Sequence, residues 1–238
     1  MLTVYIGYDD REQVAYDVLV HSIEKYASKP VNIQPIKYDT LKAKGLINRP
    51  LVNVGGRYYD TISNANAATQ FAISRFMAPV VHLEGWAVFM DCDMVLQDDI
   101  YKLMEELDPV YAVQCVKHDY IPKDSMKMDG QAQENYHKKN WSSFFAFNSS
   151  HPSMLKLDQW KVENWPGRYL HGFGWLTEDE IGPLSPGWNW LVGEQPKPET
   201  LYNAHFTLGG PWFDNWHPQE FDYIWSAEFM SYSNALNS

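Results

Sequence analysis

The sequence predicts a Rossmann-like α/β fold, with helices covering both faces of a mainly parallel, mixed central sheet. The first 165 of its 238 residues alternate short β-prone runs with segments of helical periodicity. One run, WAVFM at 86–90, is apolar throughout and is typical of a buried strand. Ligands of open α/β sheets bind outside the carboxyl ends of the strands, so the residues after these runs are the first candidates for a site.

The single elements follow from periodicity and from cap and turn residues. Strands are expected at 3–7, 31–37, 86–90, 110–116 and 143–147. Helices are expected at 10–28, 64–77, 98–107, 152–163 and 219–236. Asp10 and Gln13 fit a capping box at the start of the first helix. Residues 38–62 are expected to form a long functional loop, and 117–139 a polar, mobile stretch.

Residue usage changes after Trp165, where glycine, proline and tryptophan replace the regular alternation. We expect one domain over 1–238, in which 166–238 elaborate the fold and end in a C-terminal helix. Nine of the ten tryptophans lie at or beyond Trp141. Most are expected in the core, because a buried indole contributes a large apolar area, and only one or two are expected to line a groove.

Composition excludes several classes of protein. The net charge of −11, with no run of Lys and Arg to offset it, argues against nucleic acid as a partner. A phosphorylated small substrate would need a cation between itself and so acidic a protein. Cys92 and Cys115 are expected to be free thiols, because two cysteines make no disulfide framework. No run reaches 18 apolar residues and MLTVYIGYDD lacks a signal-peptide pattern, so a cytoplasmic protein is expected, with its oligomeric state open.

An acidic pair follows the buried strand in the segment WAVFMDCDMVLQDDI. Asp91 and Asp93 are spaced i and i+2 at the strand exit, where both carboxylates can turn toward one cation. Hard oxygen ligands suit Mn²⁺ or Mg²⁺, which would bridge the diphosphate of a nucleotide and neutralise it as a leaving group. An Asp-x-Asp match arises by chance about once in a chain this rich in Asp, so a solvated acidic turn is the alternative.

A different class of enzyme has a motif that the same residues fit. FMDCDMV also fits the motif of haloacid dehalogenase-type phosphatases, in which the first Asp, here Asp91, attacks phosphorus and the second is the acid/base. That class normally places the motif near its N-terminus and needs a further acidic pair after a later strand. Here the motif comes at residue 91 and no such pair is evident, so the phosphatase is the second hypothesis.

Five motifs, taken in order, resemble those of a known family. They are GYDD, ATQFAISRFMAP, FMDCDMVLQDDIYKL, KKNWSSFFAFN and NAHFTLGGPWF. Over most of residues 1–213 the chain is similar to glycosyltransferase family eight and its uncharacterised bacterial and viral relatives, which have the nucleotide-sugar-binding GT-A fold. The resemblance implies that 1–165 form the nucleotide-sugar-binding half and that 166–238 form the acceptor side.

The resemblance also implies roles for individual residues. The implied donor contacts come from Tyr8, Asp9, Arg75, Asp91, Cys92, Gly209 and Gly210. Within this set, Asp9 would contact the uracil base. His205 would complete a metal site with Asp91 and Asp93, and a neutral imidazole is a suitable nitrogen ligand beside two carboxylates.

Two acidic residues are candidates for the reacting end of the donor. In WLTEDEIGPL, Glu178 and Asp179 resemble family residues that touch the donor sugar near the reacting carbon. There they would stabilise positive charge that develops on the sugar in the transition state. A solvated acidic turn is an equally good interpretation of the same residues.

The chain departs from the family at three places. The spacing from His205 to the glycines is one residue longer than in the family. Gly210 stands where the family has a lysine that clamps the diphosphate, and Trp141-Ser142-Ser143 replaces an Asn-x-Gly motif. The implied activity is metal-dependent transfer of a hexose from a UDP-sugar to the hydroxyl of a carbohydrate or other acceptor, with retention of configuration. No dedicated base is evident in the sequence. A non-catalytic sugar-binding protein is the third hypothesis.

Overall fold

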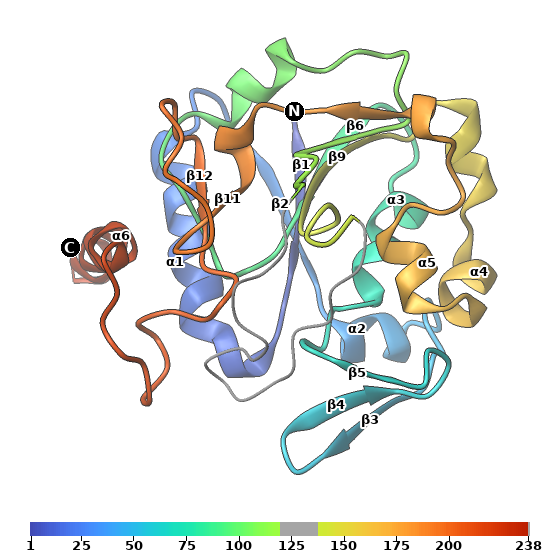
Figure 1. Cartoon of the computed structure of the whole chain (residues 1–238), viewed down its shortest axis with the longest axis horizontal. Helices are drawn as coiled ribbons and strands as arrows, with labels where there is room; N and C mark the ends of the chain where they lie inside the picture. The colour runs from blue at the N-terminus through green and yellow to red at the C-terminus, as the bar shows by residue number, and fades with distance from the viewer. Residues whose placement is uncertain (120–137, 238) are drawn as a thin grey trace.

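The computed structural model describes residues 1–119 and 138–237 and contains a six-stranded central sheet (Figure 1). Its strands are β1 (Thr3–Gly7), β2 (Asn32–Ile36), β6 (Trp86–Met90), β8 (Val113–Cys115), β9 (Phe144–Asn148) and β10 (Ile181–Pro183). Their order across the sheet is β10-β8-β9-β6-β1-β2. β1 pairs in parallel with β2 and β6, and β10 pairs in parallel with β8, whereas β9 runs antiparallel between β6 and β8. The predicted mainly parallel, mixed sheet is confirmed.

Helices cover both faces of this sheet (Figure 1). One face carries α1 (Gln13–Tyr26), with α6 (Asp222–Leu236) beside it. The other carries α2 (Tyr38–Ala43), α3 (Ala78–Val81), α4 (Gln159–Asn164) and α5 (Gly167–His171). A strand between two helical layers needs apolar side chains on both sides. This explains why all of β9, and all of β6 after its first residue, are buried.

The first helix is capped one residue earlier than predicted. A 3₁₀ turn at Asp10–Glu12 precedes α1, and its cap is Asp9. The carboxylate of Asp9 accepts a hydrogen bond from the backbone N–H of Arg11, and its backbone is extended, as the cap position requires. The predicted cap at Asp10 is therefore wrong.

A second sheet joins the C-terminal part of the chain to the end of β6. It contains β7 (Met94–Leu96), β11 (Trp190–Leu191) and β12 (Asn203–His205), in the order β11-β12-β7. β12 is antiparallel to β7 and places His205 opposite Met94. A histidine far downstream in the sequence therefore lies beside the residues that follow β6. Trp190 and Phe206 of this region pack with Trp225 of α6 in an apolar cluster.

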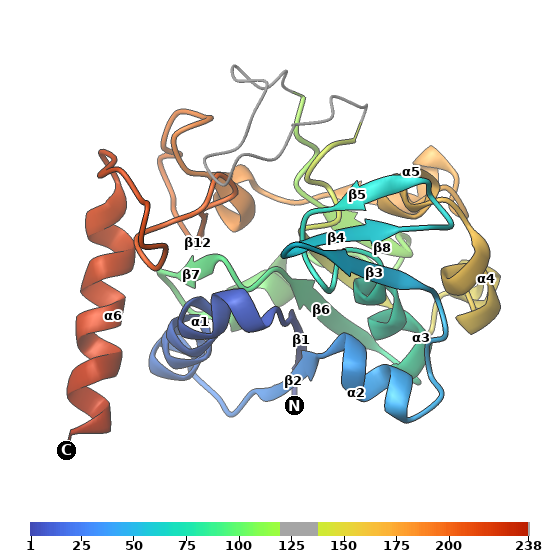
Figure 2. The same ribbon diagram turned by 90° about the horizontal axis from the view of Figure 1, so that it is seen from below.

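The segment 38–62 is not a loop, so that prediction is wrong. It contains α2 and a β-hairpin that continues into a third, antiparallel sheet (Figure 2). The strands of this sheet are β3 (Leu51–Val54), β4 (Arg57–Asp60) and β5 (Ala65–Ala67). Gly55 and Gly56 form the turn between β3 and β4, with φ of 59° and 82°. Two consecutive positive φ values fit a hairpin turn and explain the glycine pair.

The helix predicted at 64–77 is wrong as well. β5 occupies its start, where Asn64 has a positive φ of 52°. Only its end is helical, as a 3₁₀ turn at Ser74–Met77 that leads into α3. Pro79 lies in the first turn of α3 instead of ending a helix, because proline is well tolerated where a helix has no use for its N–H.

Two further predicted helices are shorter or divided. The helix expected at 152–163 consists of a 3₁₀ turn at Pro152–Lys156 and of α4. Asp158 separates them because its side chain caps α4. The helix expected at 98–107 is a 3₁₀ helix, Ile100–Glu105, capped by Asp99. Of the polar stretch predicted at 117–139, residues 120–137 lie outside the described residues.

The C-terminal helix α6 packs beside α1 (Figures 1 and 2). Its Glu228 is 3% exposed and accepts hydrogen bonds from the ammonium of Lys25, at 2.9 Å, and from the hydroxyl of Tyr26, at 2.6 Å. The predicted C-terminal helix is therefore present and contacts α1. Across the described ranges, no helix combines the length and the apolar character needed to cross a membrane.

Candidate metal and donor site

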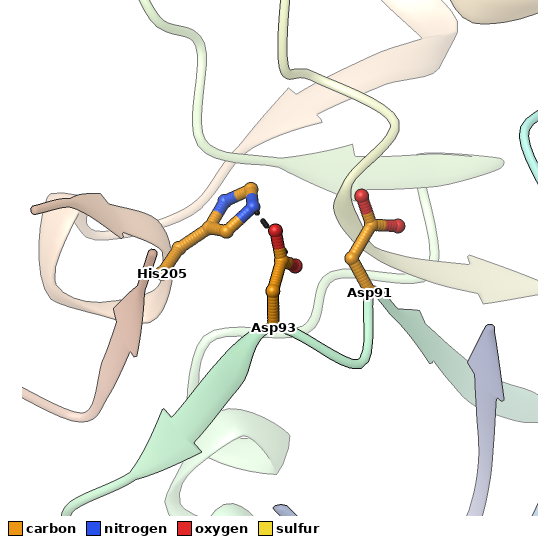
Figure 3. A group of neighbouring side chains, drawn as sticks. All are labelled: Asp91, Asp93 and His205. Atoms are coloured by element: carbon orange, nitrogen blue, oxygen red, sulfur yellow. Dashed lines mark ion pairs between the residues drawn. The ribbon is translucent and has the colours of Figure 1, made fainter. Parts of the chain in front are cut away.

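Asp91, Asp93 and His205 converge at the carboxyl end of β6 (Figure 3). One ligand atom from each residue lies within 4.8 Å of those from the other two. His205 Nε2 is 3.3 Å from Asp93 Oδ1. The structure thus brings together the three side chains that were predicted to hold a metal.

The backbone around the acidic pair is fixed on both sides. The N–H of Asp91 donates to the carbonyl of Ser143 at 2.9 Å, which extends the pairing of β6 with β9 by one residue. The carbonyl of Asp93 accepts from the N–H of Phe206 at 2.9 Å, beside the end of β12. Cys92, between the two acids, has its side chain in the core. The chain bends at Cys92 and Asp93, and the carboxylates of Asp91 and Asp93 lie on the same side of this bend as His205 (Figure 3).

The donor set fits a divalent cation. Two carboxylates and one imidazole are ligands that suit Mn²⁺, and the carboxylates also suit Mg²⁺. The carboxylates of Asp91 and Asp93 repel each other at this separation, and a cation between them would remove that repulsion. His205 contributes its nitrogen from a buried position, being 2% exposed.

Arg75, which was predicted to lie near the donor, forms an ion pair with Asp91. Its Nη1 is 2.7 Å from Asp91 Oδ1 and donates to the carbonyl of Ser142 at 2.8 Å. The guanidinium lies 5.2 Å from the ring centroids of both Phe71 and Phe89. A carboxylate has two oxygens with two lone pairs each, so this ion pair is compatible with a bond from Asp91 to a cation.

Asp9, at the end of β1, is fully buried and accepts four hydrogen bonds. Its Oδ1 accepts from the backbone N–H and Nε of Arg11, and its Oδ2 from Nη2 of Arg11 and the N–H of Gln70. Arg11 also donates to the carbonyls of Gly56 and Ala68. Asp9 therefore anchors the third sheet to the end of β1, and its contact with a uracil base stays a prediction.

Tyr8 and Cys92, two further predicted donor contacts, are both buried. The hydroxyl of Tyr8 donates to Oε1 of Gln13, and the ammonium of Lys37 lies 3.6 Å from the centroid of the Tyr8 ring. Burial raises the pKa of the Cys92 thiol well above its ordinary value. Only the backbone of Cys92 faces the site, so its predicted contact with a nucleotide would have to come from there.

Gly209 and Gly210 follow β12 and are required for local packing. Gly209 has a φ of 104°, a conformation that other residues rarely adopt. A Cβ on Gly210 would lie 2.0 Å from the ring of Trp212. The family's lysine could not stand at position 210 unless this tryptophan moved, which is a physical reason for the departure.

Glu178 and Asp179, the predicted catalytic pair, lie on a 3₁₀ turn at Glu178–Glu180. Both are exposed, and neither belongs to the group formed by Asp91, Asp93 and His205. Glu178 forms an ion pair with Nζ of Lys138, which also donates to the carbonyl of Gly172. The turn is therefore tied to the segment before β9, and a contact with a donor sugar stays a prediction.

Two buried polar residues beside His205 were not predicted from the sequence. Asn189, at the end of a 3₁₀ turn at Pro186–Asn189, is 0% exposed, and its Oδ1 is 2.9 Å from His205 Nδ1. His118 is 7% exposed, and burial together with nearby His205 lowers its pKa to about 3. Asn189 stands between two tryptophans in the sequence. A lone amide between large apolar residues is a usable signal, because buried amides need partners.

The fold is that of GT-A-type glycosyltransferases. Solved structures with this fold cover nearly the whole chain. The galactosyltransferase LgtC, bound to donor and acceptor sugar analogs, superimposes with a TM-score of 0.59 at 11% identity, over 100% of this chain and 97% of LgtC. GlyE from Streptococcus pneumoniae TIGR4 gives a TM-score of 0.60 at 11% identity, over 99% of this chain but 62% of GlyE.

A third glycosyltransferase, the bifunctional WbbM, gives a TM-score of 0.59 at 14% identity, over 100% of this chain and 52% of WbbM. A likeness at such low identity establishes the fold. The chain belongs to the same family as Protein CDI of Arabidopsis thaliana. The two sequences are 41% identical over an alignment of 238 residues, gaps included, which covers 97% of this chain and 86% of the plant protein. No model of a protein family matches the sequence.

Proposed function

We propose that this protein is a metal-dependent glycosyltransferase, which transfers a hexose from a nucleotide sugar, most simply a UDP-sugar, to an acceptor hydroxyl. One observation carries this proposal. In a GT-A fold, Asp91, Asp93 and His205 converge within 4.8 Å at the carboxyl end of a central strand, where ligands of such sheets bind. LgtC, which has the same fold, is a galactosyltransferase whose structure holds donor and acceptor sugar analogs.

The charge of the protein explains why a cation is needed. At a net charge of −11 the chain repels a diphosphate, and the two carboxylates of the site strengthen that repulsion. Asp91, Asp93 and His205 would hold Mn²⁺ or Mg²⁺. When bound, the ion supplies charge neutralisation for the diphosphate as it becomes the leaving group. Arg75 would hold the carboxylate of Asp91 in place while the site binds the cation and the donor.

The remaining predicted residues supply the rest of the donor site in this proposal. Tyr8 and Asp9 would lie beside the base, and the backbones of Cys92, Gly209 and Gly210 beside the ribose and phosphates. Glu178 or Asp179 would hydrogen-bond the sugar hydroxyls and stabilise positive charge at the reacting carbon. Retention of configuration is proposed by analogy with the resembling family. The acceptor's proton would then pass to the leaving phosphate, because no dedicated base is assigned.

The phosphatase hypothesis is less well supported. Its nucleophile would be Asp91, but Oδ1 of Asp91 is 2.7 Å from the guanidinium of Arg75, which lowers the nucleophilicity of that carboxylate. The motif also follows β6, the third strand of the central sheet in chain order, and the fold is that of glycosyltransferases. A non-catalytic sugar-binding protein remains the alternative that requires a measurement of turnover.

Thermal melting with UDP, GDP and dTDP, each with and without Mn²⁺, tests the proposal. Ligand at 100 times its dissociation constant stabilises the native state by about 2.7 kcal/mol, which is a clear shift in Tm. We expect the largest shift with UDP and Mn²⁺ together, and release of hexose from a UDP-sugar under the same conditions. No shift with any nucleotide in the presence of Mn²⁺ would refute the proposal. Binding without turnover would favour the sugar-binding alternative.

A further inference from the structure

Asn189 is oriented by its neighbours in a way that determines which nitrogen of His205 carries the proton. Its Nδ2 is 3.2 Å from the carbonyl oxygen of Asn140 and 2.9 Å from Oγ of Ser143. A carbonyl oxygen only accepts hydrogen bonds, so the amide nitrogen must face Asn140. The hydroxyl of Ser143 donates to the same carbonyl at 2.7 Å, which leaves a lone pair of Oγ for the amide of Asn189.

The opposite end of the amide fixes the imidazole. Oδ1 of Asn189 lies 2.9 Å from Nδ1 of His205, and an amide oxygen only accepts. Nδ1 must therefore be the protonated nitrogen. In neutral His205 the lone pair is then on Nε2, which faces Asp93 Oδ1 at 3.3 Å. Two acceptors that face each other repel, unless a cation or a proton lies between them.

The alternative tautomer of His205, with the proton on Nε2, would disfavour metal binding. With the proton on Nε2, His205 would donate a hydrogen bond to Asp93 and satisfy both groups without a cation. That state competes with metal binding, because the lone pair would be on Nδ1, on the side away from the carboxylates. The position of Asn189 is set by the chain itself, since it directly precedes β11, which pairs in parallel with β12 and places Leu191 opposite His205.

We propose that Asn189 is a positioning residue for the metal site: it holds His205 in the Nδ1–H tautomer and so keeps Nε2 available as a metal ligand. The inference rests on the metal site proposed above and adds a residue that touches neither metal nor substrate. Partners of this kind on metal-binding histidines typically change metal affinity by about 10–100-fold when they are removed.

The test is Mn²⁺ affinity, measured by electron paramagnetic resonance of free Mn²⁺, in the full chain and three variants. Asn189→Ala is expected to weaken Mn²⁺ binding by about 10–100-fold. Asn189→Asp keeps an acceptor for Nδ1–H and is expected to restore affinity to within about threefold of the parent, although it loses the donor to Asn140. This rescue is what separates positioning from a merely structural role.

Asn203→Ala is the matched control. Asn203 is also 0% exposed and on β12, and it donates to the carbonyl of Trp188 and to the sulfur of Met94, away from His205 Nδ1. We expect it to lower Tm as Asn189→Ala does, with Mn²⁺ affinity unchanged. In ¹⁵N spectra of the metal-free protein, His205 is expected as the Nδ1–H tautomer in the parent chain and as a mixture in Asn189→Ala.

The possible failures are distinguishable. Parental Mn²⁺ affinity in Asn189→Ala, or equal losses in Asn189→Ala and Asn203→Ala, would overturn the role of Asn189 and leave the metal site standing. No Mn²⁺ binding by the parent chain would overturn both the metal site and this inference.

Discussion

Nη1 of Arg75 lies 2.7 Å from Oδ1 of Asp91, and both side chains are largely buried at the end of β6. Arg75 also donates from Nε to the carbonyl of Ala72 at 3.1 Å, and from Nη1 to the carbonyl of Ser142. A guanidinium can make these three contacts at once because its donors are arranged in a rigid plane. The ion pair joins the segment before α3 to the acidic pair, so a residue predicted to touch the donor also supports a predicted metal ligand.

Replacing Arg75 by Met should therefore destabilise the fold. The change leaves the carboxylate of Asp91 buried without its cation and removes donors from two carbonyls. Breaking a buried ion pair on one side costs about 3–5 kcal/mol. Urea unfolding of R75M, D91N and the double variant would measure the coupling in a double-mutant cycle. A coupling energy near zero would show that the two groups do not stabilise each other.

Gly210→Ala should disturb Trp212, because the new Cβ would lie 2.0 Å from its ring. Overpacking of this kind costs about 1–3 kcal/mol, and near-ultraviolet circular dichroism should change. Gly85→Ala is the comparison, since Gly85 has a positive φ of 74° but nothing within 4 Å of its Cβ position. Gly210→Lys restores the residue of the resembling family, yet we expect no tighter UDP binding. A gain in UDP affinity would contradict this account of the departure.

His171 should make the stability of the protein depend on pH. Burial, with Arg75 and Arg49 nearby, lowers its pKa to about 3 from an ordinary value of 6.5. Between these values the unfolded chain binds a proton that the folded chain does not, so the free energy of unfolding falls as pH drops below about 6.5. This group contributes a slope on the order of 1 kcal/mol per pH unit.

His171→Asn removes this titration while it keeps a polar atom for the hydroxyl of Ser142, which is 2.7 Å from Nδ1. Urea unfolding at pH 7 and pH 5 should therefore show a smaller loss of stability in the variant than in the parent. If both proteins lose the same free energy of unfolding, His171 does not titrate as described.

Glu178→Gln and Asp179→Asn test the predicted reacting end of the donor site. Glu178 is the better candidate, because Lys138 holds its carboxylate in place. Glu178→Gln should lower kcat by about 100-fold and leave the affinity for UDP unchanged. Asp179→Asn is expected to have a small effect. If kcat is the same in both variants as in the parent chain, the turn at Glu178–Glu180 has a structural role only.

The inner strands β6 and β9 were predictable because a strand buried on both faces is almost entirely apolar, as WAVFM at 86–90 shows. The short edge strand β10 was not predicted. The acidic pair was predictable because it directly follows such a strand. His205 was predictable only through a resemblance, since its approach to Asp93 depends on the pairing of β12 with β7, which no local pattern encodes. The assignment of 1–238 to one domain stays a prediction.

Other parts were missed for identifiable reasons. β3 is largely exposed and β4 is buried only at alternate residues, so neither strand has a strong apolar pattern. The Gly55-Gly56 turn of this hairpin was the one clear signal. The helix predicted at 64–77 had suitable periodicity, but the pairing of Ala65–Ala67 with β4 prevailed over it. The contact of Asn189 with His205 and the ion pair of Arg75 with Asp91 join distant segments, so these two contacts could be assigned only from coordinates.

The most direct test of the metal site is the binding of UDP to the parent chain and to Asp93→Asn, measured by calorimetry with and without Mn²⁺. Asp98→Asn is the matched control, because Asp98 lies in the same acidic segment but pairs with Lys102 at 2.7 Å. We predict that Mn²⁺ tightens UDP binding at least tenfold in the parent chain and in Asp98→Asn, and has no effect in Asp93→Asn. UDP affinity that does not respond to Mn²⁺ in the parent chain, or that responds equally in all three proteins, would contradict a metal site formed by Asp91, Asp93 and His205.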